Sequence, residues 1–303
     1  MKKILFHQFG NASQLSLEEV SVPIPASDEL LIRVKAASCN PVDRGILSGN
    51  FPGLDPEFPK GMGLDFAGTV EGSGSQVSKF QLGDEVYGWM GYGSSGSFSE
   101  YVVAPQAQVF MKPSYLSFEE AACLPLVGAT AYNALILRGK LKQGQSVFIH
   151  GCTGGVGQLA VQIAKHFGAY VIGTCSLRTQ DLARIIGADE VYEYRKLDLK
   201  PFAKRADIAL VTGGKLDFED ILPILKSKGV FTDIRPKNHV HPQYRQVITA
   251  PVTQEMLNAV NKIAHESQLK LIIGERVSLQ QAIPTLIKLE QGKRASGKTV
   301  LVM

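Results

Sequence analysis

The chain has 303 residues, of which 45% are hydrophobic and 20% charged, as in a soluble globular protein with a sizeable core. Its formal net charge of +4 comes without a basic run, which argues against nucleic-acid binding. No stretch has the apolar length of a membrane span, and the apolar run in MKKILFHQFG (1–10) is too short for a secretion signal. We therefore expect no membrane partner.

The cysteines of the chain are scattered and form no CxxC motif. There are four of them, Cys39, Cys123, Cys152 and Cys175. Such spacing favours reduced thiols and a cytoplasmic protein over a disulfide framework.

The first part of the chain is rich in glycine and proline and has short apolar runs separated by turn signals. This pattern predicts an irregular all-β module. The expected strands are LLIRVKAAS (30–38), FAGTVEG (66–72), DEVYGW (84–89) and SFSEYVVAP (97–105).

From about Phe118 strands alternate with helices, which predicts βαβ units and a parallel sheet. Apolar residues recur three and four apart in GGVGQLAVQIAKHFG (154–168), the mark of an amphipathic helix. Further helices are expected at 179–187, 253–266 and 278–292, and strands at 146–151, 170–174, 191–194, 207–212, 229–234 and 298–303. A strand pattern also resumes at LKLII (269–273).

The segment HGCTGGVG (150–157) follows an apolar strand and opens a periodic helix, the setting that a dinucleotide-binding loop requires. Free N–H groups near Gly155, Val156 and Gly157 would face an anionic diphosphate at the positive end of the helix dipole. Gly154 and Gly157 allow close approach because they lack a Cβ atom. Cys152 stands where the strict motif has its first glycine, and Gly151 can supply the tight turn instead.

The next strand, YVIGTCSLR (170–178), ends without the acidic residue that holds the ribose 2′-hydroxyl in NAD enzymes. Ser176 and Arg178 offer a hydroxyl and a guanidinium to a 2′-phosphate instead. We therefore predict NADPH rather than NADH as the cofactor. The alternative is that Arg178 is a solvated residue at a helix start.

With these motifs in order, the whole chain resembles the zinc-independent quinone oxidoreductase branch of the medium-chain dehydrogenase/reductase superfamily. The matching segments include VKAASCNPVDRGILSG (34–49), PKGMGLDFAGTVEG (59–72), AACLPLVGATAYNAL (121–135), HGCTGGVGQLAVQIAKHFGA (150–169) and GKTVLVM (297–303). The resemblance implies an α/β protein with a GroES-like β-barrel catalytic domain, residues 1–118 with 268–303. It also implies an inserted Rossmann domain, a doubly wound parallel sheet, at residues 119–267.

The resemblance to the zinc-dependent branch fails at the metal ligands. The position of its cysteine ligand holds Asn40, with Cys39 one residue out of register, and the position of its histidine ligand holds Leu64. Zinc needs Cys or His at fixed spacing, so we predict no metal. His239 and His241 lie in a predicted loop, where solvated side chains are expected rather than ligands.

The resemblance also assigns roles to single residues on the catalytic side. Asn40 would act near the nicotinamide or the substrate, with a loop-capping amide as the alternative. Asp43 would orient Asn40 or the cofactor, or else serve as a carboxylate at a helix start. Phe51 and Tyr92 are candidates for the acceptor pocket, although buried packing is the ordinary role of such aromatics.

Further residues are assigned to the cofactor. Thr130 matches a family threonine near the nicotinamide end, with a hydroxyl bonded to its own helix turn as the alternative. Thr212 and Gly213 end a parallel strand and should border the nicotinamide ribose. Tyr194 matches a tyrosine beside the adenosine phosphate, and Arg294 is a second candidate for that phosphate.

Three alternatives to an NADPH:quinone oxidoreductase stay open. They are an NADPH-dependent alkenal or enone double-bond reductase, a non-catalytic NADPH-binding protein, and a zinc alcohol dehydrogenase. Separately, YRQVITA (244–250) reads as a strand at a sheet edge, where the family often pairs two copies, so we predict a homodimer.

Overall fold

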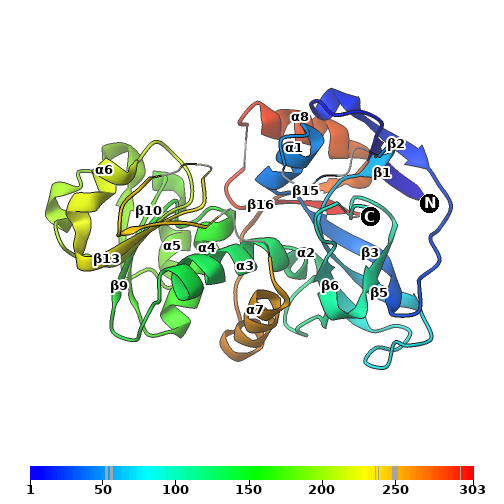
Figure 1. The fold of residues 1–303 in the computed structure, drawn as a ribbon, viewed down its shortest axis with the longest axis horizontal. Coiled ribbons are helices and arrows are strands. Elements are labelled where there is room, and N and C mark those ends of the chain that lie inside the picture. Colours follow the sequence, from blue (N-terminus) through cyan, green and yellow to red (C-terminus); the bar gives the residue numbers. More distant parts are fainter. Residues whose placement is uncertain are drawn as a thin grey trace. The chain divides into compact units, whose positions relative to one another are not determined.

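The computed structural model describes residues 1–51, 54, 57–93, 95–235, 237, 239–247, 252–293 and 295–303. Contacts divide the chain into two compact units (Figure 1). Unit 1 comprises Met1–Leu126 with Ile273–Met303, and unit 2 comprises Val127–Ile272.

Unit 1 is built mainly of antiparallel strands. Its larger sheet has the order β15-β16-β3-β5-β6-β8, with β7 pairing with β3, and a smaller sheet has the order β2-β1-β4. The strands of the larger sheet are β3 (Glu29–Ser38), β5 (Asp65–Ser73), β6 (Glu85–Trp89), β7 (Tyr101–Pro105), β8 (Val109–Met111), β15 (Ile273–Ser278) and β16 (Lys298–Val302). Those of the smaller sheet are β1 (Lys2–Phe6), β2 (Leu15–Glu19) and β4 (Lys60–Gly61), and the helices of the unit are α1 (Pro41–Leu47), α2 (Phe118–Ala121) and α8 (Ala282–Glu290).

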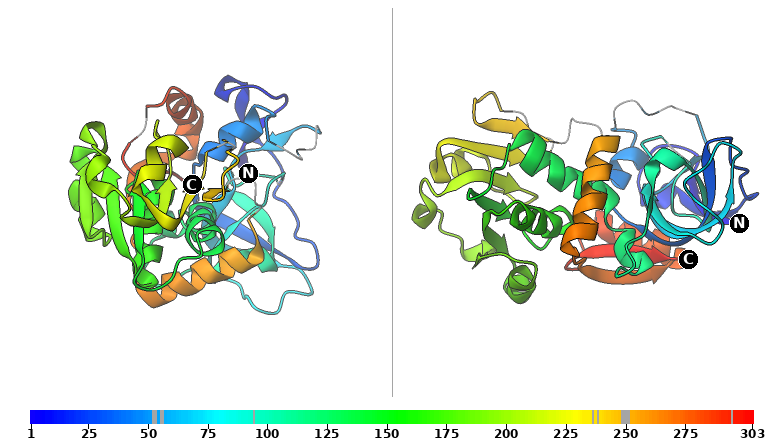
Figure 2. Two further views of the ribbon diagram at one scale, coloured as in Figure 1. Left: turned by 60° about the vertical axis from the view of Figure 1, so that its left-hand side comes forward. Right: turned by 90° about the horizontal axis from the view of Figure 1, so that it is seen from below.

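The C-terminal strand ties the two ends of the chain together within unit 1. Strand β16 lies between β15 and β3, antiparallel to β3 with Val300 opposite Ser38 (Figure 2). Alternate side chains of β3, including Leu30, Ile32 and Val34, are buried, as expected for a strand with one face on a core. The segment after residue 272 therefore contributes directly to this β unit.

Unit 2 is a six-stranded sheet with the order β11-β10-β9-β12-β13-β14 and parallel pairing throughout. Because the order reverses beside β9, right-handed crossovers place helices on both faces, which makes the sheet doubly wound. The strands are β9 (Ser146–His150), β10 (Tyr170–Cys175), β11 (Glu190–Glu193), β12 (Ala206–Val211), β13 (Leu225–Asp233) and β14 (Tyr244–Gln246). The helices are α3 (Pro125–Tyr132), which begins at the end of unit 1, α4 (Gly155–His166), α5 (Gln180–Ile185), α6 (Phe218–Ile221) and α7 (Gln254–Ser267).

Two predicted strands differ from the structure. Residues 97–100 precede β7 and make only an isolated bridge, Lys3 with Ser99, so the first half of the 97–105 prediction is wrong. The strand expected at 269–273 begins at Ile273 instead. Gln162 and Gln158 of α4 explain the shift, because their Oε1 atoms accept from the N–H groups of Lys270 at 2.7 Å and Ile272 at 2.5 Å. Side chains thus occupy the donors that a neighbouring strand would need.

Strand β14 lies at the end of the sheet order, as predicted for residues 244–246. The rest of the predicted strand, 248–250, lies outside the described residues. The homodimer stays a prediction.

Candidate functional site

Helix α4 begins with an N-terminus that no side chain caps. Its N-cap is Gly154, and the first turn contains no acidic residue. The N–H groups of Gly155, Val156 and Gly157 precede the first intrahelical acceptors, so they are free to bind an external anion. The positive end of the helix dipole adds to the attraction. The residues present therefore fit the diphosphate of a dinucleotide.

The glycines of this loop are required by close backbone contacts. A Cβ atom on Gly157 would lie 2.1 Å from the carbonyl oxygen of Gly151 and 2.8 Å from the Cα of Cys152. Gly151 has a φ of +81°, and a Cβ atom there would meet Thr212 Oγ1 at 2.5 Å. Substitution at either position must displace the turn that presents the helix start.

Cys152 fits at the first glycine position of the motif because a different glycine makes room for it. Its side chain is fully buried, and a Cβ atom on Gly173 of β10 would lie 2.7 Å from its Sγ atom. In the usual motif, a glycine within the loop leaves the required space. Here Gly173 on the neighbouring strand leaves space for the Cys152 side chain.

Polar side chains gather at the carboxyl ends of β9, β10 and β12, where ligands of parallel sheets bind. Thr212 Oγ1 donates to the carbonyl oxygens of His150 at 2.8 Å and Gly151 at 3.2 Å. His150 Nδ1 lies 2.8 Å from Thr174 Oγ1, and the His150 ring lies edge-on to Tyr194 with centroids 6.3 Å apart. Thr212 and Tyr194 thus lie beside the glycine loop, whereas His150 and Thr174 were not singled out from the sequence. Their position as polar residues at strand ends was the available signal.

His150 is neutral at physiological pH. Burial, and secondarily the positive charge of Arg235, lower its pKa to about 4. Arg235 itself is held by Asp233, with Nη2 and Oδ2 2.7 Å apart, and donates to the carbonyls of Gly214 and Leu216. It therefore fixes the loop after β12, in which a Cβ atom on Gly213 would meet nothing within 4 Å. Gly213 therefore leaves open space beyond the carboxyl end of β12.

The end of β10 carries hydroxyl groups and one free guanidinium. Ser176 Oγ lies 3.0 Å from Thr179 Oγ1, which lies 3.0 Å from Thr153 Oγ1 in the glycine loop. Arg178 is exposed and has no hydrogen-bond or ion-pair partner among the described residues. Hydroxyls and a free guanidinium suit a phosphate group.

Two further residues were predicted to contact the cofactor. Thr130 lies in α3 and is half-buried. Arg294 lies outside the described residues.

In unit 1, Asn40 lies at the centre of a buried charged network. Its Nδ2 donates to Asp65 Oδ2 at 2.9 Å and to the Ser38 carbonyl at 3.2 Å. Its Oδ1 accepts from the ammonium of Lys298 at 2.6 Å, and that ammonium also donates to the Cys39 carbonyl at 2.8 Å. The amide therefore bridges a buried carboxylate and a buried ammonium from distant parts of the chain.

Asp43 lies next to this network at the start of α1. Its Oδ2 accepts from the backbone N–H of Asn40 at 2.7 Å, the reciprocal of the 3.1 Å bond from the Asp43 N–H to the Asn40 carbonyl. Its buried Oδ1 has no hydrogen-bond partner in the described part of the chain. The group lines a cavity with room for about one water molecule, together with Lys60, Met62 and Leu64.

Burial controls the ionisation of both carboxylates. It raises the pKa of Asp43 to about 7 and that of Asp65 to about 6, although the nearby Lys298 opposes both shifts. Two carboxyl groups share one buried ammonium, so full ionisation leaves an uncompensated negative charge, which burial disfavours.

The structure brings the two predicted acceptor-pocket residues together. The rings of Phe51 and Tyr92 are 4.5 Å apart, and Trp89 lies edge-on to Tyr92 at 5.1 Å. Burial, followed by the charges of Asp65 and Asp43, raises the pKa of Tyr92 to about 12. The charges of the network therefore act on Tyr92. The Tyr92 phenol stays protonated at neutral pH.

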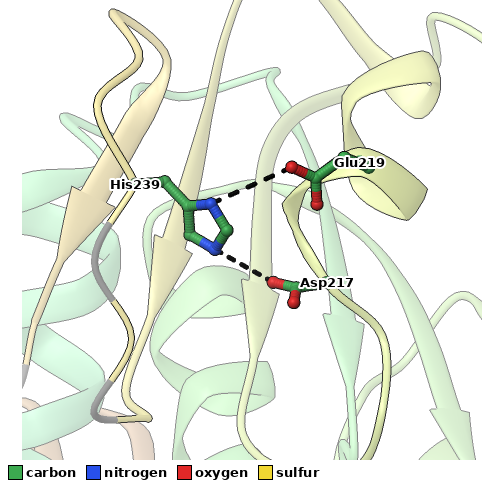
Figure 3. Close-up of side chains that lie close together, drawn as sticks. All are labelled: Asp217, Glu219 and His239. Atoms are coloured by element: carbon green, nitrogen blue, oxygen red, sulfur yellow. Dashed lines mark hydrogen bonds and ion pairs between the residues drawn. The ribbon is translucent and has the colours of Figure 1, made fainter.

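One group of potential metal ligands occurs among the described residues: Asp217, Glu219 and His239 in unit 2 (Figure 3). Asp217 Oδ2 already pairs with the ammonium of Lys237 at 2.7 Å, and its Oδ1 accepts from the Phe218 N–H at 2.9 Å. His239 Nε2 lies 3.0 Å from Asp217 Oδ1, so His239 is not the solvated side chain expected from the sequence. An ammonium thus already neutralises the Asp217 carboxylate of this group.

None of the helices in the described parts of the chain combines the length and apolar character that a bilayer crossing requires.

Comparisons with known proteins give matches over both units of the chain. Residues 26–114 match the family model of the alcohol dehydrogenase GroES-like domain, and residues 155–234 match that of zinc-binding dehydrogenases. The 2-methylene-furan-3-one reductase of Solanum lycopersicum is 34% identical over 312 residues, 99% of this chain and 79% of that protein. The quinone oxidoreductase of Lama guanicoe is 30% identical over 327 residues, 100% of this chain and 98% of that protein.

Solved structures show the same likeness. The quinone oxidoreductase from Coxiella burnetii has a TM-score of 0.87 and 32% identity, covering 100% of this chain and 99% of that one. The predicted fold, a GroES-like β domain with a Rossmann domain, is confirmed.

Proposed function

The chain belongs to the quinone oxidoreductase branch of the medium-chain dehydrogenase/reductase superfamily, and from that premise we propose an NADPH-dependent oxidoreductase that delivers hydride to a quinone without zinc. The family implies a nicotinamide cofactor, and the observation that carries the proposal is the uncapped, glycine-lined start of α4. A bound NADPH supplies the hydride. The chain's own residues bind the dinucleotide and hold the acceptor.

The end of β10 supports NADPH over NADH. The five residues after this strand, 176–180, contain no carboxylate to repel a 2′-phosphate, and Ser176 and the exposed Arg178 offer hydrogen-bond donors and a positive charge. We assign these two residues to the 2′-phosphate, Gly154 to Gly157 to the diphosphate, and Thr212 and Gly213 to the nicotinamide ribose.

The surroundings of Asn40 support a reaction without zinc. The Asn40 oxygen already accepts from the Lys298 ammonium, whose positive charge opposes a second cation there. Leu64, at the other matching ligand position, is an alkyl side chain that is 2% exposed. These residues do not fit a zinc ion.

Without a Lewis acid, the acceptor must itself be electrophilic, as quinones and enones are. In this proposal Phe51 and Tyr92 stack against a planar acceptor, while Asn40 and Asp43 maintain the polar side of its site. An enone is the second candidate acceptor, because a relative at 34% identity is a 2-methylene-furan-3-one reductase.

The proposal is tested by following NADPH and NADH oxidation over a panel of quinones, enones and aldehydes. We expect NADPH with a quinone to give the highest kcat/KM. Arg178→Ala should lower kcat/KM for NADPH by roughly tenfold to a hundredfold and leave that for NADH unchanged, since one charge-assisted phosphate contact is lost. Arg184→Ala is the matched control, because Arg184 is also exposed and pairs with Asp181 at 2.9 Å.

Three results would contradict the proposal. NADH used as well as NADPH would refute the cofactor assignment, and stoichiometric zinc in the active protein would refute the metal-free reaction. NADPH binding without turnover of any acceptor would point to a non-catalytic NADPH-binding protein.

A further inference from the structure

Two of the four cysteines lie against each other beneath the glycine loop of unit 2. Cys152 follows the turn at Gly151, and its N–H donates to the carbonyl of Thr174 at 3.0 Å. Because β9 and β10 pair with His150 opposite Thr174, this bond places Cys152 next to the last residue of β10, Cys175.

The side chains of this pair lie on the same face of the sheet. Thr174 directs its hydroxyl to His150, so Gly173 and Cys175 project to the opposite face, as alternation along a strand requires. Cys152 lies on that face too, since its Sγ atom is 2.7 Å from the place of a Cβ atom on Gly173. The two thiols are close enough for each to shift the pKa of the other.

The other two thiols of the chain differ in their chemistry. Burial raises the pKa of both Cys39 and Cys123, the latter to about 12, and Cys123 Sγ donates to the Glu119 carbonyl at 3.2 Å. The interaction with the neighbouring Cys152 thiol instead lowers the pKa of Cys175 against the effect of burial, while the same interaction, together with burial, raises the pKa of Cys152. Thiolate character makes Cys175 the nucleophile of its pair.

We propose that Cys152 and Cys175 form a reversible disulfide that weakens dinucleotide binding, a form of regulation that rests on the proposed function. Hydrogen peroxide is the oxidant: the Cys175 thiolate attacks one peroxide oxygen and releases hydroxide, which leaves a sulfenic acid. The Cys152 sulfur then attacks the Cys175 sulfur, the S–S bond forms and water leaves. In sum, two thiols and one peroxide give one disulfide and two waters, and a dithiol reverses the reaction.

Access to the pair comes from the segment that follows β10. Cys175 is 2% exposed, and the next residues include Leu177, which is 66% exposed, and the exposed Arg178. Such exposed segments at the end of a strand open locally at low free-energy cost, and opening here uncovers Cys175 to a small oxidant.

The disulfide acts on the binding loop through tight backbone packing. Joining the sulfurs brings them to about 2 Å, closer than any hydrogen-bonded contact, and draws Cys152 toward β10. The Gly157 backbone packs so tightly on Cys152 that a Cβ atom would lie 2.8 Å from the Cys152 Cα. A shift of Cys152 therefore moves the N–H groups at the start of α4, which bind the diphosphate in the proposed function.

The test treats the full chain with hydrogen peroxide and measures three quantities: intact mass, cross-linked peptides and NADPH affinity by cofactor fluorescence. We expect loss of two hydrogens by mass, a peptide linking Cys152 to Cys175, and a roughly tenfold or larger rise in the Kd for NADPH that dithiothreitol reverses. Reciprocity requires that saturating NADPH shift the thiol–disulfide equilibrium toward the dithiol, measured in a dithiothreitol redox buffer.

Matched variants keep the test decisive even if one of them folds poorly. Cys152→Ser and Cys175→Ser should each abolish both the cross-link and the change in affinity, whereas Cys123→Ser should behave as wild type. Oxidation without a 152–175 link, or a link that leaves NADPH affinity unchanged, would overturn the proposal. A link in a protein that never binds NADPH would contradict the proposed function instead.

Discussion

The glycine loop of unit 2 and the charged network of unit 1 are both polar sites, but they are built from different groups. The loop uses backbone N–H groups and missing side chains, all from Gly151 to Gly157. The network uses side chains from distant positions, with Lys298 bonded to Asn40 across 258 residues of sequence. We therefore expect an added side-chain atom to disrupt the glycine loop, and removal of a charged side chain to disrupt the network.

The largest expected effect comes from removing the buried ammonium of the network. Lys298→Met leaves Asp65 and the Asn40 oxygen buried without their cation, and we expect a loss of about 3–5 kcal/mol in the free energy of unfolding. Urea denaturation measures it.

Two variants control this experiment. Lys293→Met changes an exposed lysine and should alter stability by less than about 0.5 kcal/mol. The double variant Asp65→Asn with Lys298→Met should recover part of the loss, because the uncompensated carboxylate is gone. Equal stability of Lys298→Met and wild type would show that the network is not held by charge.

The next prediction concerns the effect of one added side-chain atom in the glycine loop. Gly157→Ala places a Cβ atom 2.1 Å from the Gly151 carbonyl oxygen, which must displace the helix start. We expect a roughly hundredfold or larger rise in the Kd for NADPH, measured by fluorescence titration.

Gly72→Ala in β5 is the control for this change, because its Cβ atom would meet Leu31 at an ordinary 3.5 Å. Thermal unfolding of both variants separates loss of binding from loss of fold. A folded Gly157→Ala protein with unchanged NADPH affinity would show that NADPH binding does not require close backbone packing at Gly157.

A further effect concerns the pH dependence of stability through Asp43. Its folded pKa of about 7 lies above the ordinary aspartate value of 3.8, so the folded protein binds a proton between these pH values. That contribution to stability is present at low pH and is lost as pH rises through about 7.

Asp43→Asn removes the titration and keeps an oxygen to accept the Asn40 N–H. Between about pH 4 and 8, we expect the wild type to lose stability progressively relative to the variant, measured by urea denaturation at each pH. Parallel profiles for the two proteins would show that Asp43 does not change its protonation there.

Elements with local signals could be predicted from the sequence alone. The glycine loop, the helix after it and the absence of an acid after β10 lie within a single stretch, 146–178, whose strand, turn and helix signals agree with one another. Short apolar runs between turn signals also predicted β3, β5, β6, β7 and β16 of unit 1, but not β2, β4, β8 or β15.

Contacts between side chains that are far apart in the sequence could not be predicted and are known only from the structure. Asn40 lies between Asp65 and Lys298 because β3, β5 and β16 are neighbours in one sheet, which no local pattern reveals. The strand expected at 269–273 was displaced because glutamines of α4 satisfy its backbone donors. Cys152 could replace a glycine because Gly173 leaves room on the next strand. In each case the outcome depends on contacts between segments far apart in the chain, which periodicity and spacing do not encode.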